Sequence, residues 1–389
     1  MTSFGIERTG GWRAVFEVAN RLHDLNYDVT ITTLYGNPSW FPLKVKVNCV
    51  ASVPDRRLAR GFDRVAGTYR RLRGRYAESS IFYLSRLLRM GFGAELDLMP
   101  YLSENIPDCD VNVATWYPTA FAVYFSGKGR PYYFLQDSSA MVAEQCFYRG
   151  EYCLRMFETT LRLPFHFLAN SSYTRDLILE SQPGAQITKI GVGIETTIFH
   201  PSGKKLFDDL KKPIVMVILG GFKFKGDETA IRVLNGICEK IPLHGILVAS
   251  EKSFREVFDS GKPKFTYTRF PPVNQEELAT LYSSADLFLY TSYLESFGLP
   301  PLEAMACGTP VVTTDCLGNR DYAIDGYNCL LVPPGDIEGL TQASLRVLSD
   351  SKVAQQLRAG GLETAKKFTW DKVVQRVDDA LNGSEGYQR

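Results

Sequence analysis

The amino-acid sequence predicts two doubly wound α/β domains, each built on a parallel sheet. The length of 389 residues exceeds what one core ordinarily holds and suits two domains of roughly 150–200 residues each. Short runs of β-branched and aromatic residues alternate with stretches of helical period, which is typical of parallel strands joined by crossover helices. The alternation stops in the polar, Lys-rich stretch His200–Pro213 and then restarts. We therefore expect an N-terminal domain over 1–200 and a C-terminal domain over 213–368, joined by a linker.

The N-terminal domain begins with Gly10-Gly11, which leads into a helix as the first strand-to-helix turn of such a fold does. Only nine residues precede this turn, so Met1–Ile6 can supply at most a short stub of a first strand. Either the fold tolerates that short strand or the chain starts too late, and the sequence leaves both open. The other expected strands are Val29–Leu34, Val45–Val50, Val111–Thr115, Tyr132–Gln136 and Phe165–Ala169. The expected helices are Trp12–Leu25, Pro118–Ser126, Ser139–Leu161 and Ser172–Ser181.

The C-terminal domain repeats the alternation. Its expected strands are Ile214–Leu219, Gly245–Ala249, Phe265–Thr268, Leu287–Thr291, Pro310–Thr313 and Cys329–Val332. Its expected helices are Asp227–Lys240, Gln275–Ser284, Pro301–Cys307, Asp336–Ser349 and Ser351–Ala359. An amphipathic helix over Thr369–Leu381 ends the pattern, and we expect residues 369–389 to cross back to the N-terminal domain. Because doubly wound domains bind ligands at the carboxyl ends of their strands, the expected site is a cleft between the two domains.

Composition and charge exclude several classes of function. The net charge is +1, so no overall field favours nucleic acid as a partner. No apolar run reaches the roughly 18–20 residues that span a bilayer, and the N-terminus lacks the charged-then-apolar pattern of a signal peptide. The eight cysteines form no C-x-x-C pair, and neither they nor the four histidines have zinc-ligand spacing. We therefore expect reduced, mostly buried thiols, a cytoplasmic location and no metal.

The segment Glu295–Val312, ESFGLPPLEAMACGTPVV, gives the strongest indication of a binding site. Its paired prolines mark a helix start, since proline has no N–H to lose there. Gly298 lets the backbone approach a ligand, and a strand, a glycine turn and a helix N-terminus together favour a diphosphate. Glu295 and Glu303 would repel a phosphate, but carboxylates can bridge the vicinal hydroxyls of a sugar or ribose. The alternative is a buried strand, turn and helix whose two acids are favoured by the helix dipole.

The E-x(7)-E pair in this segment resembles the signature of retaining glycosyltransferases of family four. Those enzymes have the GT-B fold, in which two Rossmann-like domains face an interdomain cleft. The similarity extends to Gly10-Gly11, Gly191–Pro201, Leu278–Leu289 and Asn328–Asp336. The resemblance implies transfer of a sugar from a nucleotide-diphosphate donor to an acceptor hydroxyl with retention, in polysaccharide or glycolipid biosynthesis.

The same resemblance assigns roles within the segment. It implies that Glu295 faces the transferred sugar and that Glu303 binds the ribose hydroxyls. The backbone at Phe297, Gly298 and Leu299 would hold the diphosphate. Gly10 and Gly11 join the expected donor-binding residues from the other domain.

Basic residues should also meet the diphosphate, because negative charge builds on the leaving group during transfer. The family places an Arg and a Lys after the first strand of the second domain. The corresponding stretch here is Gly220–Asp227. Its Lys225-Gly226 pair matches the Lys-Gly of the family, but the Arg is absent. Lys223 could take the place of the Arg, or the second cation could come from elsewhere. The alternative is two solvated lysines on a loop.

The N-terminal domain lacks a histidine that many members of the family carry near the reacting sugar. Gln136 or Asp137 occupies the matching position, followed by two serines. Asp137 could accept a proton or a hydrogen bond from the acceptor hydroxyl. It could equally be an ordinary helix N-cap, and the sequence does not decide between the two.

A basic amphipathic stretch, Arg56–Tyr76, stands apart from these motifs. Its apolar residues recur at alternating spacings of four and three, and Asp63 is the only acid among eight arginines. A basic helix with aromatic residues on its other side suits an anionic membrane surface. Peripheral contact with the inner face of a membrane would fit a lipid-linked acceptor. The alternative is a helix packed on the first domain with a solvated basic face.

Two other functions remain open at this point. One is a nucleotide-sugar epimerase on the same fold, which would release free nucleotide and altered sugar without an acceptor. The other is a catalytically silent sugar-binding protein, because the Arg and the His of the family are missing. For a transferase, the expected catalytic residues are Glu295, Lys225 and Asp137.

Overall fold

The computed structural model describes residues 1–6, 9–50, 99–145, 150–203, 205–207, 209–260 and 262–383. The basic stretch Arg56–Tyr76 lies outside these residues, so its predicted helix remains a prediction. The chain divides into two compact units. The first comprises Met1–Tyr133 and Leu163–Phe165, and the second comprises Phe134–Arg162 and His166–Arg389.

A seven-stranded sheet has the order β3-β2-β1-β4-β5-β6-β7, and its first five strands lie wholly or mostly in the first unit. The strands of the first unit are β1 (Thr2–Ile6), β2 (Thr30–Gly36), β3 (Lys46–Cys49), β4 (Val111–Ala114) and most of β5 (Arg130–Leu135). Its helices are α1 (Gly10–Asp24), α5 (Met99–Glu104) and α6 (Tyr117–Ser126).

Strand β1 is a short strand that lies within the range Met1–Ile6 expected from the sequence. It pairs in parallel with β2 from Thr2 to Ile6 and with β4 at Thr2, so it holds a central place in the sheet. The buried hydroxyl of Thr2 also donates to the side-chain oxygen of Asn112 on β4 (2.8 Å). The fold therefore forms its first strand from the residues that precede Gly10.

The second unit adds β6 (His166–Ala169) and β7 (Gln186–Lys189) to that sheet and contains the whole of a six-stranded sheet. The second sheet has the order β10-β9-β8-β11-β12-β13, and every pair in it is parallel. Its strands are β8 (Ile214–Leu219), β9 (His244–Ala249), β10 (Thr266–Phe270), β11 (Leu287–Tyr290), β12 (Val311–Thr314) and β13 (Leu330–Val332).

The helices of the second unit mostly fall where the sequence predicts them. They are α7 (Ser139–Gln145), α8 (Gly150–Thr160), α9 (Ser172–Ser181), α10 (Asp227–Cys238), α11 (Glu251–Ser260), α12 (Gln275–Ser284), α13 (Leu299–Ala306), α14 (Ile337–Ser349), α15 (Ser351–Ala365) and α16 (Trp370–Asn382). Two short 3₁₀ helices, η1 (Lys223–Lys225) and η2 (Gly318–Asp321), lie in loops that matter for the site. The prediction of a single helix over Ser139–Leu161 is wrong, because α7 and α8 pack against each other, which two stretches of one straight helix cannot do.

The core of the six-stranded sheet explains why these segments form buried parallel strands. Val215, Leu247, Leu289 and Val312 come from four different strands, and each is at most 1% exposed. Helices α10 and α14 contact each other, and α14 also contacts β11, β12 and β13. Strands buried on both faces need continuous apolar runs, which is the pattern that predicted them. The fold is therefore two parallel α/β sheets with crossover helices, as the sequence predicts.

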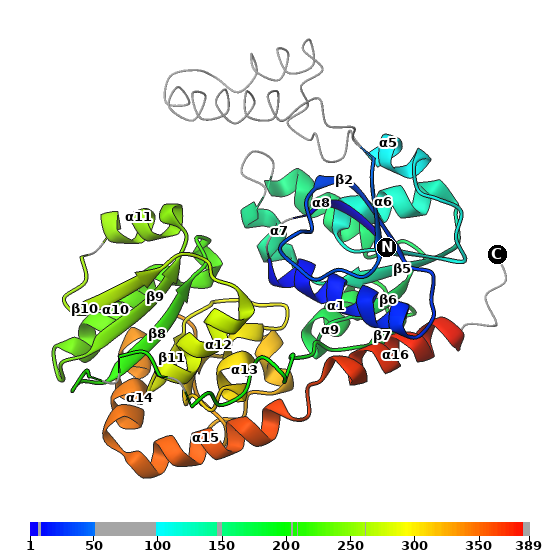
Figure 1. The fold of residues 1–389 in the computed structure, drawn as a ribbon. Coiled ribbons are helices and arrows are strands. Elements are labelled where there is room, and N and C mark those ends of the chain that lie inside the picture. Colours follow the sequence, from blue (N-terminus) through cyan, green and yellow to red (C-terminus); the bar gives the residue numbers. More distant parts are fainter. Residues whose placement is uncertain are drawn as a thin grey trace, which may run out of the picture. The chain divides into compact units, whose positions relative to one another are not determined.

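The predicted linker and the last helix each contact elements of the second unit that are far from them in the sequence. The predicted linker His200–Pro213 forms no helix or strand in its described residues, and the N–H groups of Ser202 and Leu206 donate to serine hydroxyls of α12. Helix α16, red in Figure 1, lies beside β7. There the guanidinium of Arg376 donates to the carbonyl of Ile190 (2.9 Å).

Two expectations drawn from composition can be compared with the structure. Within the described part of the chain, no helix has both the length and the apolar character needed to cross a bilayer. The seven cysteines there are free thiols: Cys307, Cys316 and Cys329 are buried, whereas Cys49 and Cys109 are exposed. The prediction of mostly buried thiols is therefore wrong for these residues.

Candidate active site

The loop 295–298, the second half of the connection from β11 to α13, is fixed by backbone hydrogen bonds. The N–H of Glu295 donates to the carbonyl of Cys316 (2.9 Å), and the N–H of Gly318 donates to the carbonyl of Glu295 (3.1 Å). A Cβ on Gly318 would lie 2.3 Å from the carbonyl carbon of Ser296, so only glycine permits this approach. The loop is thus clamped to the segment that follows β12.

The carboxylate of Glu295 is buried and held by two donors. Glu295 is 5% exposed, and its Oε1 accepts from the hydroxyl of Tyr290 (2.5 Å) and from the ammonium of Lys225 (2.7 Å). Burial, followed by the negative charge of Glu295, holds the pKa of Tyr290 well above its ordinary value, so the phenol stays a donor. Since both bonds go to Oε1, Oε2 accepts none from any described residue and is available to a ligand.

Lys225 reaches Glu295 because η1 is packed against the end of β11. Gly226, which follows Lys225, has φ +68°, and its Cβ would lie 2.1 Å from the carbonyl oxygen of Thr291. The hydroxyl of Thr291 donates to the carbonyl of Gly226 (2.9 Å). The ammonium of Lys225 uses one of its three donors on Glu295 and keeps the others for an anion. The structure therefore joins two of the predicted catalytic residues, 70 positions apart.

The rest of the η1 loop is held by two carboxylates that the sequence analysis missed. Asp227 accepts from the N–H groups of Gly220 (3.0 Å) and Gly221 (2.7 Å). Glu144 accepts from the N–H groups of Lys223 and Phe224. Burial raises the pKa of Asp227 to about 6, although the two glycine N–H groups act in the opposite direction.

The side chain of Lys223 is exposed, and among the described residues we find no contact between it and either glutamate of the E-x(7)-E pair. Its predicted role as the second cation remains a prediction. In the sequence, Asp227 is recognisable only as an acid in the first turn of a helix. No local pattern indicates that Glu144 binds this loop.

Glu303 lies in α13, four residues beyond the start of the helix at Leu299. The helix begins two residues earlier than predicted, so both prolines are inside its first turn. Glu303 is 3% exposed, and its Oε2 accepts from the hydroxyl of Tyr282 on α12 (3.2 Å). Tyr282 is a second tyrosine that the sequence analysis missed, and each glutamate of the pair is thus oriented by a buried phenol.

The start of α13 has the properties expected of an anion site. Gly298 has φ +80°, and its carbonyl accepts from the hydroxyl of Tyr322. In the described part of the chain, the N–H groups of Phe297, Gly298 and Leu299 donate to no protein acceptor. The two prolines that follow have no N–H, so these three groups are the donors that the helix start offers to a ligand.

Asp137 lies between β5 and α7, two residues before the start of α7. The hydroxyl of Ser138 accepts from the N–H of Met141 (3.4 Å), so Ser138 supplies the cap and the prediction of Asp137 as an N-cap is wrong. No described residue forms a hydrogen bond with the Asp137 carboxylate. Burial raises the pKa of Asp137 from 3.8 to about 7, a value suited to proton transfer near neutral pH.

This pKa predicts how stability depends on pH. Between about pH 4 and pH 7 the folded chain holds a proton on Asp137 that the unfolded chain releases, so the contribution of this group to stability falls as pH rises through that range. Asn resembles the protonated form. The Asp137→Asn variant should therefore melt at a higher temperature than the wild type at pH 8, by about 2–4 °C for each kcal/mol of penalty removed. The two proteins should melt alike near pH 4. Equal melting curves at both values would contradict the raised pKa.

The two remaining predicted residues, Gly10 and Gly11, begin α1 in the first unit. The N-cap of this helix is Thr9, whose hydroxyl accepts from the N–H of Trp12 (3.3 Å). Both glycines are exposed. As for metals, no group of three or more His, Cys, Asp or Glu side chains among the described residues is arranged to hold an ion.

Comparisons with solved structures show which class of protein has this fold. Sucrose-phosphate synthase from Thermosynechococcus elongatus superposes with a TM-score of 0.72 at 17% identity, covering 98% of both chains. HepE of Anabaena, solved in complex with UDP-glucose, gives a TM-score of 0.71 at 16% identity over 98% of this chain and 99% of that one. At these identities the comparison shows the fold alone: two parallel α/β sheets of the kind found in GT-B glycosyltransferases.

Sequence comparison finds a family match in the part of the chain that contains Lys225, Glu295 and Glu303. Residues 204–364 match the family of glycosyl transferases group 1, which confirms the predicted resemblance over these residues. A D-inositol 3-phosphate glycosyltransferase from Streptomyces bingchenggensis is 35% identical over 120 residues, which are 31% of this chain and 26% of that protein. The match spans only about a quarter of the length of the first curated relatives. Membership of family four within the group remains a prediction.

Proposed function

We propose that the chain is a retaining glycosyltransferase that moves a sugar from a nucleotide-diphosphate donor to an acceptor hydroxyl. The observation that carries the proposal is the contact of Lys225 with Glu295 (2.7 Å) beside a helix start with three available N–H groups. Together these residues offer a cation, a carboxylate and a set of backbone donors within one loop system. Such a set suits a ligand with a sugar at one end and a diphosphate at the other.

In the proposed reaction, the bond between the anomeric carbon and the diphosphate oxygen breaks, and its electron pair leaves with the diphosphate. Lys225 and the N–H groups at Phe297, Gly298 and Leu299 stabilise the charge that develops there. The acceptor oxygen bonds to the same face of the anomeric carbon, and its proton goes to Asp137. The carboxylate of Glu295 stabilises the positive, oxocarbenium-like sugar, and no covalent enzyme intermediate forms.

The functional experiment is a screen of UDP-, GDP-, ADP- and dTDP-sugars by thermal shift and by donor turnover. UDP-sugars come first, because HepE was solved with UDP-glucose. Stabilisation by one nucleotide class together with acceptor-dependent release of nucleoside diphosphate supports the proposal. Release of free nucleotide and altered sugar without an acceptor would indicate an epimerase instead. Binding without any turnover would indicate a sugar-binding protein.

Glu303 is proposed to bind the ribose hydroxyls of the donor. The Glu303→Ala variant should raise the dissociation constant for the nucleoside diphosphate by about tenfold to a hundredfold, since two charge-assisted hydrogen bonds are lost. Its turnover at saturating donor should change much less. Isothermal titration calorimetry with the nucleoside diphosphate alone measures the effect. The matched variant Tyr282→Phe keeps the carboxylate but removes its 3.2 Å partner, so it should give a smaller loss. Unchanged affinity in Glu303→Ala would overturn the assignment.

The acceptor and the place where the protein works belong to the proposal as well. A glycan or lipid-linked acceptor, a role in polysaccharide or glycolipid biosynthesis, and a cytoplasmic location are inferred from the resemblance and from composition. Peripheral membrane contact through Arg56–Tyr76 remains a prediction, since that stretch lies outside the described residues.

A further inference from the structure

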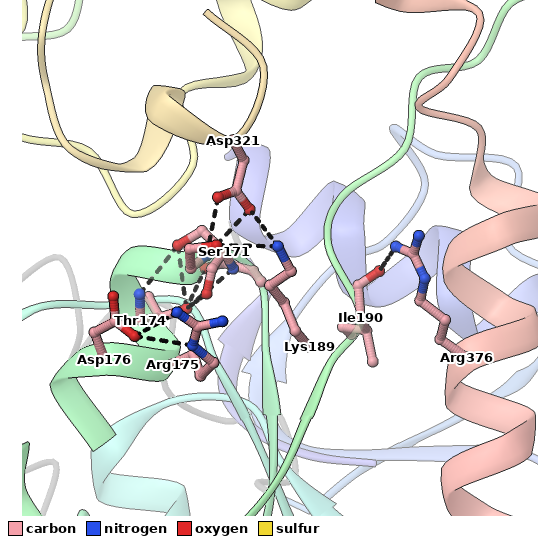
Figure 2. Close-up of polar contacts among 10 residues, drawn as sticks. Ser171, Thr174, Arg175, Asp176, Lys189, Ile190, Asp321 and Arg376 are labelled. Atoms are coloured by element: carbon pink, nitrogen blue, oxygen red, sulfur yellow. Dashed lines mark hydrogen bonds and ion pairs between the residues drawn. The ribbon is translucent and has the colours of Figure 1, made fainter. Parts of the chain in front are cut away.

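Two contacts join the loop 295–298 and the neighbouring η2 to the start of α9, within the second unit. The side-chain amide of Asn170, after β6, donates to the hydroxyl of Ser296 (3.3 Å). The carboxylate of Asp321, the last residue of η2, accepts from the backbone N–H of Ser172 through both oxygens (3.2 and 3.1 Å). These partners are 126 and 149 positions apart in the chain. Figure 2 shows Asp321 facing the start of α9.

The charges at this junction are complementary. The side chain of Asp321 is 11% exposed, and the ammonium of Lys189 lies 3.4 Å from its carboxylate and donates to the hydroxyl of Ser172 (3.0 Å). A helix N-terminus also favours a negative charge. Yet α9 already has its own cap, because the hydroxyl of Ser171 accepts from the N–H of Thr174 (3.1 Å). The Ser171 hydroxyl satisfies the N–H of Thr174, whereas Asp321 accepts from the different N–H of Ser172, so the contact ties η2 to the start of α9.

The other end of η2 is attached to Glu295. Helix η2 begins at Gly318, whose N–H donates to the carbonyl of Glu295 (3.1 Å). The preceding residue Leu317 forms a parallel bridge with Glu295. The first residue of η2 is therefore bonded to the backbone of Glu295, and its last residue, Asp321, is bonded to the start of α9. A shift of Asp321 would move the residues that fix Glu295.

Asn170 provides a second, independent attachment. It is 3% exposed, and its side-chain oxygen accepts from the hydroxyl of Thr174 (2.9 Å). That bond fixes the amide orientation so that its nitrogen donates to Ser296. Ser296 directly follows Glu295 in the chain. The segment Asn170–Ser172 therefore holds the loop 295–298 at Ser296 and, through η2, at Glu295.

We propose that Asp321 and Asn170 are positioning residues, which hold the carboxylate of Glu295 where it meets Lys225 and the transferred sugar. The proposal rests on the proposed transferase function. Neither residue belongs to the groups assigned to the donor, so their effect should appear in turnover rather than in donor binding. Small displacements of a reacting group can lower a rate by up to about 100-fold, which sets the scale of the effect.

The test compares Asp321→Ala with Asp176→Asn as a matched control. Asp176 is a carboxylate on α9. Among the described residues it pairs only with the adjacent Arg175 (2.7 Å) and contacts neither η2 nor the loop 295–298 (Figure 2). We expect Asp321→Ala to lower kcat by about tenfold, with donor KM changed less than twofold, and Asp176→Asn to match the wild type. Asp321→Asn keeps an acceptor for Ser172 and should recover part of the loss. Equal kcat for Asp321→Ala and the control would overturn the proposal.

A second readout does not depend on turnover. Hydrogen exchange in a peptide covering 295–299 should be several times faster in Asp321→Ala and in Asn170→Ala than in Asp176→Asn, at a temperature where all are folded. A wild type that turns over no donor refutes the proposed function, whereas unchanged exchange in both variants refutes the positioning role. Faster exchange with unchanged kcat would also refute it, because the held loop would not matter for transfer.

Discussion

The Glu295→Gln variant is expected to lower kcat by about 100-fold to 1,000-fold while leaving the affinity for the nucleoside diphosphate within a few fold. Gln has nearly the same shape, and its carbonyl oxygen can still accept from Tyr290 and Lys225. What is lost is the negative charge beside the sugar, which matters most when the sugar becomes positive in the transition state. Steady-state rates at saturating donor, together with calorimetric binding of the nucleoside diphosphate, separate the two quantities.

The control for this prediction is Glu276→Gln, the same chemical change on an exposed residue of α12. It should leave both kcat and affinity unchanged. If Glu295→Gln turns over donor as fast as this control, Glu295 is not catalytic. If it instead loses affinity as Glu303→Ala does, the division of roles between the two glutamates is wrong.

The Lys225→Ala variant is expected to lower kcat/KM for the donor by about 100-fold or more, because a cation near the leaving group is removed. The loss of activity should be larger than that caused by removing one electrostatic donor alone. The reason is that Glu295, which is 5% exposed, would be left as a buried charge without its ion-pair partner. The melting temperature should therefore fall as well. Donor kinetics and thermal denaturation measure the two consequences, and Lys352→Ala, an exposed lysine of α15, is the unaffected control.

A milder variant tests the same lysine without removing its charge. A Cβ on Gly220 would lie 2.6 Å from Cγ of Lys225, so Gly220→Ala should push the lysine side chain away from Glu295. We expect a loss smaller than that of Lys225→Ala. Comparison with Lys223→Ala shows whether the exposed lysine replaces the missing Arg. If Lys225→Ala keeps the wild-type kcat/KM, the cation at the diphosphate must come from another residue.

The sequence predicts the turn and the helix start at 295–299 well because their signals are local. Proline at a helix start and a glycine at φ +80° are backbone requirements that a short string reveals. The hydrogen-bond partners of the two glutamates could not be predicted from a local pattern. Tyr282 and Tyr290 are part of apolar runs, and only the packing of α12 and β11 brings their hydroxyls to the carboxylates. Periodicity marks them as core and gives no sign of a polar role.

The errors in the fold have equally physical reasons. Helices α7 and α8 are expected as one helix, because the sequence on both sides favours a helix and their packing against each other is a tertiary contact. Strand β7 has four residues, two of them exposed, so it lacks the apolar run that reveals a buried strand. Asn170 contacts Ser296, and Asp321 contacts Ser172, across more than a hundred positions of the chain. Such contacts follow from topology and cannot be read from a local motif.

The two glycines that flank the candidate site also limit how this protein could be redesigned. A Cβ at Gly226 or Gly318 would fall inside the backbone of a neighbouring segment, at 2.1 Å and 2.3 Å. No choice of surrounding side chains can relieve such an overlap, because the obstructing atoms are main chain. Mutant libraries that aim to change the donor sugar should therefore keep these two codons fixed. Diversity is better placed at Tyr293, an exposed side chain on the same stretch of chain.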